Sequence, residues 1–191
     1  MSPLLTTRGA GSATGFGRLA GRTFLESFDS ISSVYLSSGT ASSIEFTSIP
    51  STYKHLQIRA SSRITSGAQF LLMEINGDTT SGNYAYHVLE ADGTTVSPSG
   101  ATSAFPRVGA TRSGTNNFGV SVINILDYAS TNKFKTIRAI AGVDDRGVGG
   151  TIQINSGLWK STSAITSLKI YGNSSSTLAQ YSRFDLYGIG S

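Results

Sequence analysis

The side chains that could carry out chemistry are scattered singly along this chain, and few have the spacing that a reaction needs. Asp144 and Asp145 are the one pair of adjacent carboxylates. They would point to opposite faces of a strand, or could bind calcium through their oxygens in a turn. His55 and His87 are the two imidazoles, and neither has a second ligand at the spacing of a zinc site. We therefore expect no catalytic residue, no metal site and no cofactor.

The glycine-rich run at residues 9–15 has the composition of a phosphate-binding loop but not its context. No strand pattern precedes it, no Gly-Lys-Ser/Thr sequence follows it, and no amphipathic helix begins there. The serine hydroxyls likewise lack the Gly-x-Ser-x-Gly sequence of an exposed nucleophile. These observations predict that the protein is not an enzyme.

Aromatic side chains are the remaining candidates for recognition. Tyr84 and Tyr86 would share one face of a strand, and Trp159 would end another strand beside Lys160. Exposed tyrosine and tryptophan rings stack on sugars and anchor protein interfaces, whereas buried ones belong to the core. Tyr84, Tyr86 and Trp159 are therefore candidate contacts with a glycan or a neighbouring subunit, and a core position is the alternative.

The elements that would position these residues are β-strands. After residue 32, apolar and polar residues alternate in short runs that Ser, Thr, Gly or Asn separates. In one such run a period of two puts Leu56 and Ile58 on one face of a sheet, and Gln57 and Arg59 on the other. Strands are expected at residues 33–37, 43–48, 54–64, 69–76, 84–90, 118–128, 134–143, 150–159, 164–171 and 182–189. This spacing predicts an all-β domain at 33–191, an antiparallel β-sandwich of the jelly-roll type.

Two segments lack this alternation. Residues 93–117 are rich in Gly, Ser and Thr and contain Pro98 and Pro106, so we expect a long irregular loop that makes contacts. Residues 24–31 have the spacing of one or two helical turns, but a strand that connects to the sandwich fits equally well. A turn is expected at Asn76-Gly77-Asp78, because Asn and Gly accept positive φ.

Residues 1–32 are expected to form an extended arm and a connector to the sandwich. Burying one large apolar side chain contributes about 1.5–3 kcal/mol, whereas ordering one residue costs about 1–2 kcal/mol. The arm should therefore be ordered only against another surface, and fully extended it would reach about 70 Å, across a neighbouring subunit. The side chains that would dock it are Leu4, Leu5, Arg8, Phe16, Arg18, Leu19 and Arg22.

Composition argues against several classes of protein. Of the 15 basic residues three lie in residues 1–22, which leaves 12 basic and 11 acidic residues, a net charge of +1, for the rest of the chain. A near-neutral body does not predict binding to nucleic acid. No apolar run approaches the ~20 residues of a membrane helix, so membrane insertion is not expected. The lack of cysteine fits assembly in a reducing cytoplasm.

Five segments, taken together and in this order, resemble a family of virion structural proteins of tailed phages that infect aquatic bacteria. The resemblance covers roughly residues 31–189, and family members are described as structural, tail or fibre proteins. The segments are 46–59 (FTSIPSTYKHLQIR), 83–87 (NYAYH), 125–128 (ILDY), 157–168 (GLWKSTSAITSL) and 182–189 (SRFDLYGI). The resemblance implies a virion part without enzymatic activity, present in many copies and made in the cytoplasm of the host bacterium.

The function expected from this resemblance is that of a tail fibre or tail-associated subunit. It would be a homo-oligomer, in the first place a homotrimer. Its arm would dock on other virion proteins of the tail or capsid, while its sandwich projects from the particle. Two alternatives stay open: a capsid decoration (cement) protein that clamps neighbouring capsid subunits, and a carbohydrate-binding module that recognises host surface polysaccharide.

Overall fold

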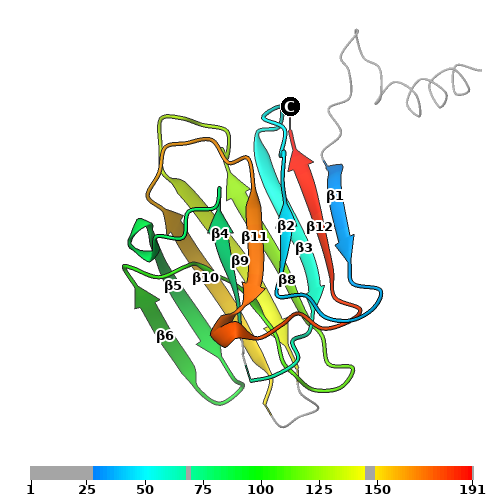
Figure 1. Cartoon of the computed structure of the whole chain (residues 1–191). Coiled ribbons are helices and arrows are strands. Elements are labelled where there is room, and N and C mark those ends of the chain that lie inside the picture. The colour runs from blue at the N-terminus through cyan, green and yellow to red at the C-terminus, as the bar shows by residue number, and fades with distance from the viewer. Residues whose placement is uncertain (1–27, 68–69, 145–148, 191) are drawn as a thin grey trace, which may run out of the picture.

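The computed structural model describes residues 28–67, 70–144 and 149–190, and these residues form two antiparallel β-sheets packed face to face (Figure 1). The large sheet has eight strands in the order β1-β12-β3-β8-β9-β10-β5-β6, and the small sheet has four in the order β2-β11-β4-β7. The strands are β1 (Asp29–Tyr35), β2 (Ser43–Phe46), β3 (His55–Ser62), β4 (Phe70–Ile75), β5 (Tyr84–Ala91), β6 (Val96–Ala101), β7 (Arg107–Ala110), β8 (Gly119–Leu126), β9 (Lys135–Val143), β10 (Thr151–Trp159), β11 (Leu168–Gly172) and β12 (Arg183–Ile189).

The predicted all-β antiparallel sandwich is confirmed. The finer prediction of a jelly roll is not confirmed. Eight strands face four, and the strand order alone does not establish the connectivity of a jelly roll. The alternation in β3 is as expected: Leu56 and Ile58 are fully buried, while Gln57 and Arg59 point away from the small sheet. The expected turn also forms, with positive φ at Asn76 (52°) and Gly77 (68°).

The sequence prediction was wrong for residues 93–117, which contain two strands and not one long loop. β6 pairs with β5 at the edge of the large sheet, where the missing N–H of Pro98 is tolerated. Its side chains are nearly all exposed, so it shows no alternation. β7 has four residues and is almost wholly buried, so it is too short to show a period. At the N-terminal side of the described residues, β1 begins at Asp29, earlier than the strand expected at 33–37.

The core lies between the two sheets and is almost entirely aliphatic and aromatic. The side chains from the small sheet meet those from β3, β8 and β12, and Tyr128 closes one end of the core. Burying each such side chain contributes about 1.5–3 kcal/mol. Fully or nearly fully buried members include Phe46, Ile58, Leu71, Met73, Ile123, Ile170 and Phe184.

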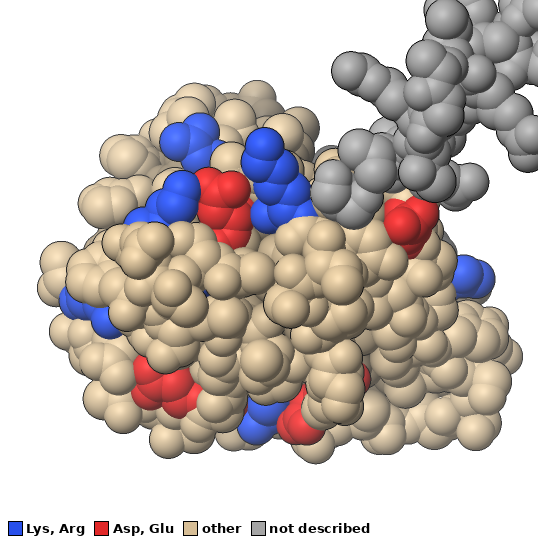
Figure 2. Space-filling model, turned by 90° about the horizontal axis from the view of Figure 1, so that it is seen from above, with Lys and Arg blue, Asp and Glu red and all other residues tan. Residues whose placement is uncertain are grey.

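The small sheet covers only one face of the large sheet. β7 lies against β8, β9 and β10, and the opposite face of these strands, which we call the outer face, points away from the small sheet (Figure 1). Seen from above, Lys, Arg, Asp and Glu side chains lie singly or in small mixed groups with wide uncharged areas between them (Figure 2). Among the residues described, no helix has the length and apolar character to cross a membrane.

Gly188 of β12 tests how tightly the end of the sandwich is packed. A Cβ at this position would overlap the ring of Tyr53, whereas a Cβ at Gly82 would meet nothing within 4 Å. We expect Gly188→Ala to lower the free energy of unfolding by about 1–3 kcal/mol, because the ring must shift. Gly82→Ala should change it by less than about 0.5 kcal/mol. Urea unfolding measures both, and equal midpoints for the two variants would contradict the packing described here.

Candidate functional site

The outer face of the large sheet carries a group of exposed apolar side chains, which we call the apolar patch. Its residues are Leu89, Val96, Val120, Val122, Ile140, Ile152 and Ile154. Val120, Ile140, Ile152 and Ile154 are 58–62% exposed. A single exposed apolar side chain is ordinary on a protein surface, but a contiguous group of them is typical of an interaction site.

The strand register places one row of these side chains next to one another. Ile154 of β10 pairs with Ile140 of β9 on one side and with Leu89 of β5 on the other. Ile140 also pairs with Val122 of β8. Side chains that are directly opposite on neighbouring strands have Cβ atoms about 4.5–5.5 Å apart, so this row is continuous across four strands.

A second row lies two residues further along the same strands. Ile152 and Val120 both pair with Gly142 of β9, and Ala91 links Ile152 to Val96 of the edge strand β6. Two rows across five strands cover roughly 300 Å² of sheet, from a strand spacing of ~4.8 Å and ~3.4 Å per residue. This area lies at the lower end of the range for the largest apolar patch on a typical monomer, which is roughly 300–600 Å².

Strand β10 shows how the patch arises. Its apolar residues Ile152 and Ile154 face outward, while Gln153 and Asn155 are buried, with 0% and 2% exposure. Neither buried amide has a hydrogen-bond partner among the described residues. The packing of β7 on the inner face is close, because a Cβ at Gly109 would touch Ser121 of β8 and Leu71 of β4.

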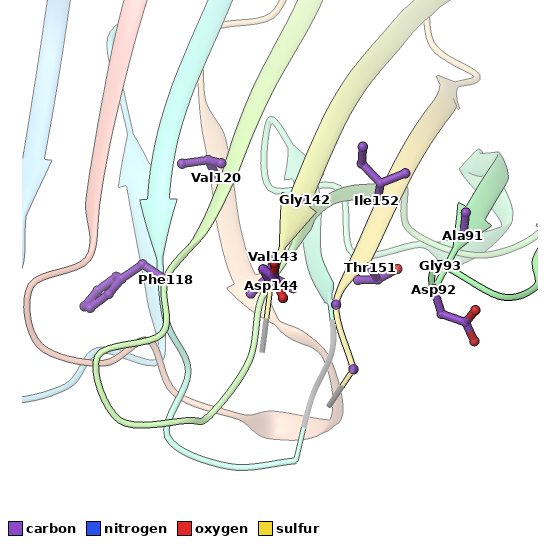
Figure 3. Close-up of a pocket in the computed structure, with 12 residues that line it drawn as sticks. Ala91, Asp92, Gly93, Phe118, Val120, Gly142, Val143, Asp144, Thr151 and Ile152 are labelled. Carbon is purple, nitrogen blue, oxygen red and sulfur yellow. The ribbon is translucent and has the colours of Figure 1, made fainter. Parts of the chain in front are cut away.

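A groove of about 720 Å³ adjoins the patch at one end of the sheet (Figure 3). We call it the end groove. Two patch residues, Val120 and Ile152, belong to its lining, as do Phe118 and the carboxylates of Asp92 and Asp144. The Asp92 carboxylate accepts hydrogen bonds from the backbone N–H groups of Thr94 and Thr95, which lower its pKa. No lysine or arginine is among the described residues that line the groove.

Two of the three aromatic residues singled out in the sequence belong to the core. Tyr84 and Trp159 are 0% and 3% exposed. The Tyr84 hydroxyl donates to the carbonyl of Asp78 at 2.9 Å, and the indole N–H of Trp159 donates to the Asp78 carboxylate at 2.8 Å. The Trp159 bond is the main reason that the pKa of Asp78 is lowered. Because their polar groups bond inside the chain, the two rings are not placed to stack on a sugar. Tyr84 and Trp159 therefore occupy core positions, the alternative given in the sequence analysis.

The third aromatic residue, Tyr86, is 9% exposed and packs against an arginine. The Arg107 guanidinium lies 5.1 Å from the Tyr86 ring centroid and 3.9 Å from that of Phe70. Its nitrogen is also 4.0 Å from the Glu90 carboxylate. Such cation–π contacts contribute about 0.5–2 kcal/mol, and here they join β4, β5 and β7 within one subunit.

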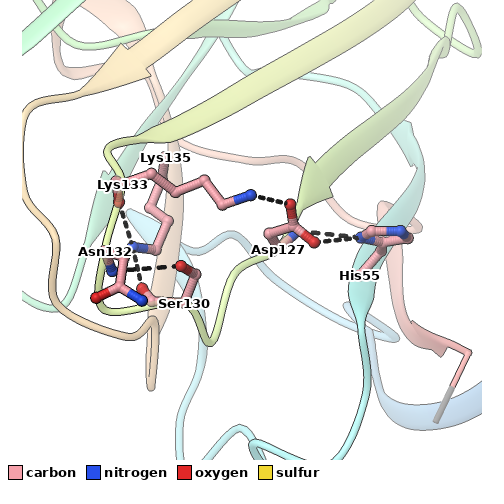
Figure 4. Close-up of polar contacts among 6 residues, drawn as sticks. All are labelled: His55, Asp127, Ser130, Asn132, Lys133 and Lys135. Atoms are coloured by element: carbon pink, nitrogen blue, oxygen red, sulfur yellow. Dashed lines mark hydrogen bonds and ion pairs between the residues drawn. The ribbon is translucent and has the colours of Figure 1, made fainter.

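His55 is a structural residue near the turn between β8 and β9 (Figure 4). Its Nδ1 accepts a hydrogen bond from the backbone N–H of Asp127 at 3.0 Å. The same nitrogen lies 3.7 Å from the Asp127 carboxylate. That carboxylate also accepts a hydrogen bond from Lys133 at 2.5 Å, which is the main cause of its lowered pKa.

Lys135 fixes the same turn from inside the protein. Its side chain is fully buried, and its ammonium donates to the carbonyls of Ser130, Lys133 and Thr162 at 2.6, 2.9 and 3.1 Å. Burial lowers the pKa of this lysine. The three carbonyls occupy all three of its donors, so Lys135 joins the turn to the loop after β10 and has no donor left for a substrate.

The remaining candidates do not converge on a reactive centre. The arm residues Leu4, Leu5, Arg8, Phe16, Arg18, Leu19 and Arg22 lie outside the described residues, as does Asp145. His87 is exposed on β5, away from His55 on β3. In the described ranges no three His, Cys, Asp or Glu side chains are grouped as a metal site would require.

The sequence analysis missed the apolar patch, although β8 gave a signal for it. This strand has apolar residues at 120, 122, 123, 125 and 126, so apolar side chains must lie on both of its faces. A strand with one solvated face would have polar residues at every second position.

Comparisons of this chain with protein-family models, with curated proteins and with solved structures found no match. The resemblance to tailed-phage virion proteins therefore stays a prediction from the sequence.

The burial of Tyr84 predicts how stability changes at alkaline pH. Desolvation raises its pKa to about 12, whereas a tyrosine in the unfolded chain ionises near pH 10. The contribution of Tyr84 to the free energy of unfolding is therefore complete below pH 10. It is lost as the pH rises to about 12, by ~1.4 kcal/mol per pH unit. Tyr84→Phe should be less stable than the wild type at pH 7, and the difference in the free energy of unfolding between the two proteins should become smaller above pH 10. Denaturant unfolding from pH 7 to 12 measures this, and a constant gap would contradict it.

The inverted polarity of β10 predicts opposite results at neighbouring positions. Gln153→Leu should raise the free energy of unfolding by about 1 kcal/mol, because it removes a buried amide that has no partner among the described residues. Ile154→Thr, on the exposed side, should change it by less than about 0.5 kcal/mol. Thermal and urea unfolding of the two variants check this. A loss of stability in Gln153→Leu as large as that of a core substitution would show that the amide is satisfied.

Proposed function

We propose that the protein is a structural subunit of a tailed-phage virion that acts through protein contacts, in the first place as a tail fibre or tail-associated protein. The observation that carries this proposal is the apolar patch. Seven exposed apolar side chains on one sheet face favour association, because burying apolar area contributes ~25 cal/mol per Å². A protein that assembles in many copies provides a neighbour to cover such a face.

The family resemblance supports the proposal because its segments lie together in the fold. The hydroxyl of Tyr128 donates to the carbonyl of Pro50, and the Ile165 N–H donates to the carbonyl of Tyr128 at 2.9 Å. The Lys160 N–H donates to the carbonyl of Asn83 at 2.7 Å. The segments that carry the resemblance thus bond to one another across the chain. A protein that shares them would share the framework of this sandwich.

The subunit is proposed to form a symmetric homo-oligomer, a trimer in the first place, and to bind other virion proteins through its arm. The near-neutral body favours association, since it gives copies little net charge with which to repel one another. The same features would serve a capsid decoration protein, which differs in where it binds on the particle and not in its chemistry.

Immunogold electron microscopy of purified particles of the phage that encodes this chain tests the proposal. An antibody against the sandwich should label the tail, and quantitative mass spectrometry should find several copies per particle. Antibody that has been adsorbed with the purified protein is the control. Label over the shell would replace the tail assignment with the decoration protein. Particles that contain none of the chain would overturn the virion function altogether.

A further inference from the structure

We propose that the arm of one copy, residues 1–27, lies across a second copy, with Phe16 and Leu19 on its apolar patch and a neighbouring part of the arm in its end groove. This inference rests on the proposed function, because it needs neighbouring copies. The arm supplies Leu4, Leu5, Phe16 and Leu19 as apolar anchors. The sheet face supplies a row of Val, Leu and Ile side chains on which Phe16 and Leu19 would lie.

The size of the patch fits an extended segment better than a whole subunit. A standard protein interface buries about 800 Å² on each partner, well over twice the roughly 300 Å² of sheet under the patch. An extended segment of about seven residues spans the ~24 Å width of five strands. The spacing of Phe16 and Leu19 lies within such a segment.

The charges of the two partners are complementary. Residues 1–27 contain Arg8, Arg18 and Arg22 and one acidic residue, Glu26. The described lining of the end groove contains Asp92 and Asp144 and no lysine or arginine, while the Arg112 guanidinium donates to the carbonyl of Gly149 at its border. Surface ion pairs contribute only about 0–1 kcal/mol each, so the charges would fix the register of the arm while the apolar anchors hold it.

The described chain begins on the same side of the sheet as the patch. The Phe28 ring stands edge-on to Tyr187 of β12, with ring centroids 6.3 Å apart. The guanidinium of Arg59, which points outward from β3, is 5.1 Å from the Phe28 ring centroid. Arg59 pairs with Val122, a patch residue. The first described residues therefore lie on the outer face, with Arg59 between Phe28 and the patch residue Val122.

The length of the arm favours a second copy over the same one. Phe16 and Leu4 precede Phe28 by 12 and 24 residues, distances of up to about 40 and 80 Å in an extended chain. The large sheet of eight strands is only about 38 Å across, at ~4.8 Å per strand. An extended arm on its own sheet would carry Leu4 and Leu5 past the far edge. Both pairs of anchors can lie on sheet surface when a second copy adjoins the first.

Cysteine crosslinking of the full chain tests the contact, because the natural sequence contains no cysteine. One tagged chain carries Leu19→Cys and a differently tagged chain carries Ile154→Cys, and the mixture is treated with a short bismaleimide. Leu126→Cys is the matched control, since Leu126 is 55% exposed on the same face but outside the patch. We expect mixed crosslinks at Ile154 to exceed those at Leu126 by at least several-fold. No excess over the control would overturn the inference. So would a double variant, Leu19→Cys with Ile154→Cys, that crosslinks only within itself.

Sedimentation equilibrium separates the arm from other occupants of the patch. Ile140→Lys with Ile154→Lys, and separately Phe16→Ser with Leu19→Ser, should each weaken self-association about tenfold or more, a loss of ~1.4 kcal/mol. Leu126→Lys should not. If only the patch variant weakens association, two patches stack on each other and the arm contact is wrong. If the chain is present on particles but the crosslink between the arm and the patch does not form, this inference is wrong and the proposed virion function stands.

Discussion

The structure depends on one constraint: a β-sheet has two faces, and the small sheet can cover only one face of the large sheet. Ile58 and Ile123 point toward the small sheet and are fully buried. Ile140 and Ile154 point away from it and remain exposed. The chain therefore satisfies its own core and leaves a second apolar surface that folding alone does not bury. Among the described residues, this imbalance is the feature that points to a function.

Buried polar groups at the two ends of the sandwich differ in whether they have hydrogen-bond partners. At the end that contains the β8–β9 turn, the polar groups of Lys135, Trp159 and Tyr84 all have partners within the chain, which fixes the loops there. Beneath the apolar patch, the amides of Gln153 and Asn155 have no partners among the described residues. A buried unpaired amide costs about 1–3 kcal/mol, so the part of the sheet nearest the patch contributes less to stability than its burial suggests.

Much of the fold could be predicted from the sequence because the signals were local. The alternation of Leu56 and Ile58 with polar neighbours identified β3, and Asn76-Gly77 identified a turn through its positive φ. β6 could not be predicted, because an exposed edge strand with Pro98 need not alternate. The face to which a strand turns its apolar residues depends on which strands neighbour it in the sheet, and one strand's sequence does not contain that information. For the same reason Trp159 could have lain in the core or on the surface until the position of Asp78 was known.

The apolar patch and the arm are each unfavourable on their own. A face bearing Ile140, Ile152 and Ile154 is an exposed apolar surface, which favours nonspecific association. The arm, rich in glycine, contains too few apolar residues to offset about 1–2 kcal/mol of ordering cost per residue. Placed together, the arm would shield the face from stacking and the face would supply the burial that the arm lacks. In the proposed assembly, the arm and the patch cover each other only when a neighbouring copy is present, so that docking of the arm would be coupled to assembly.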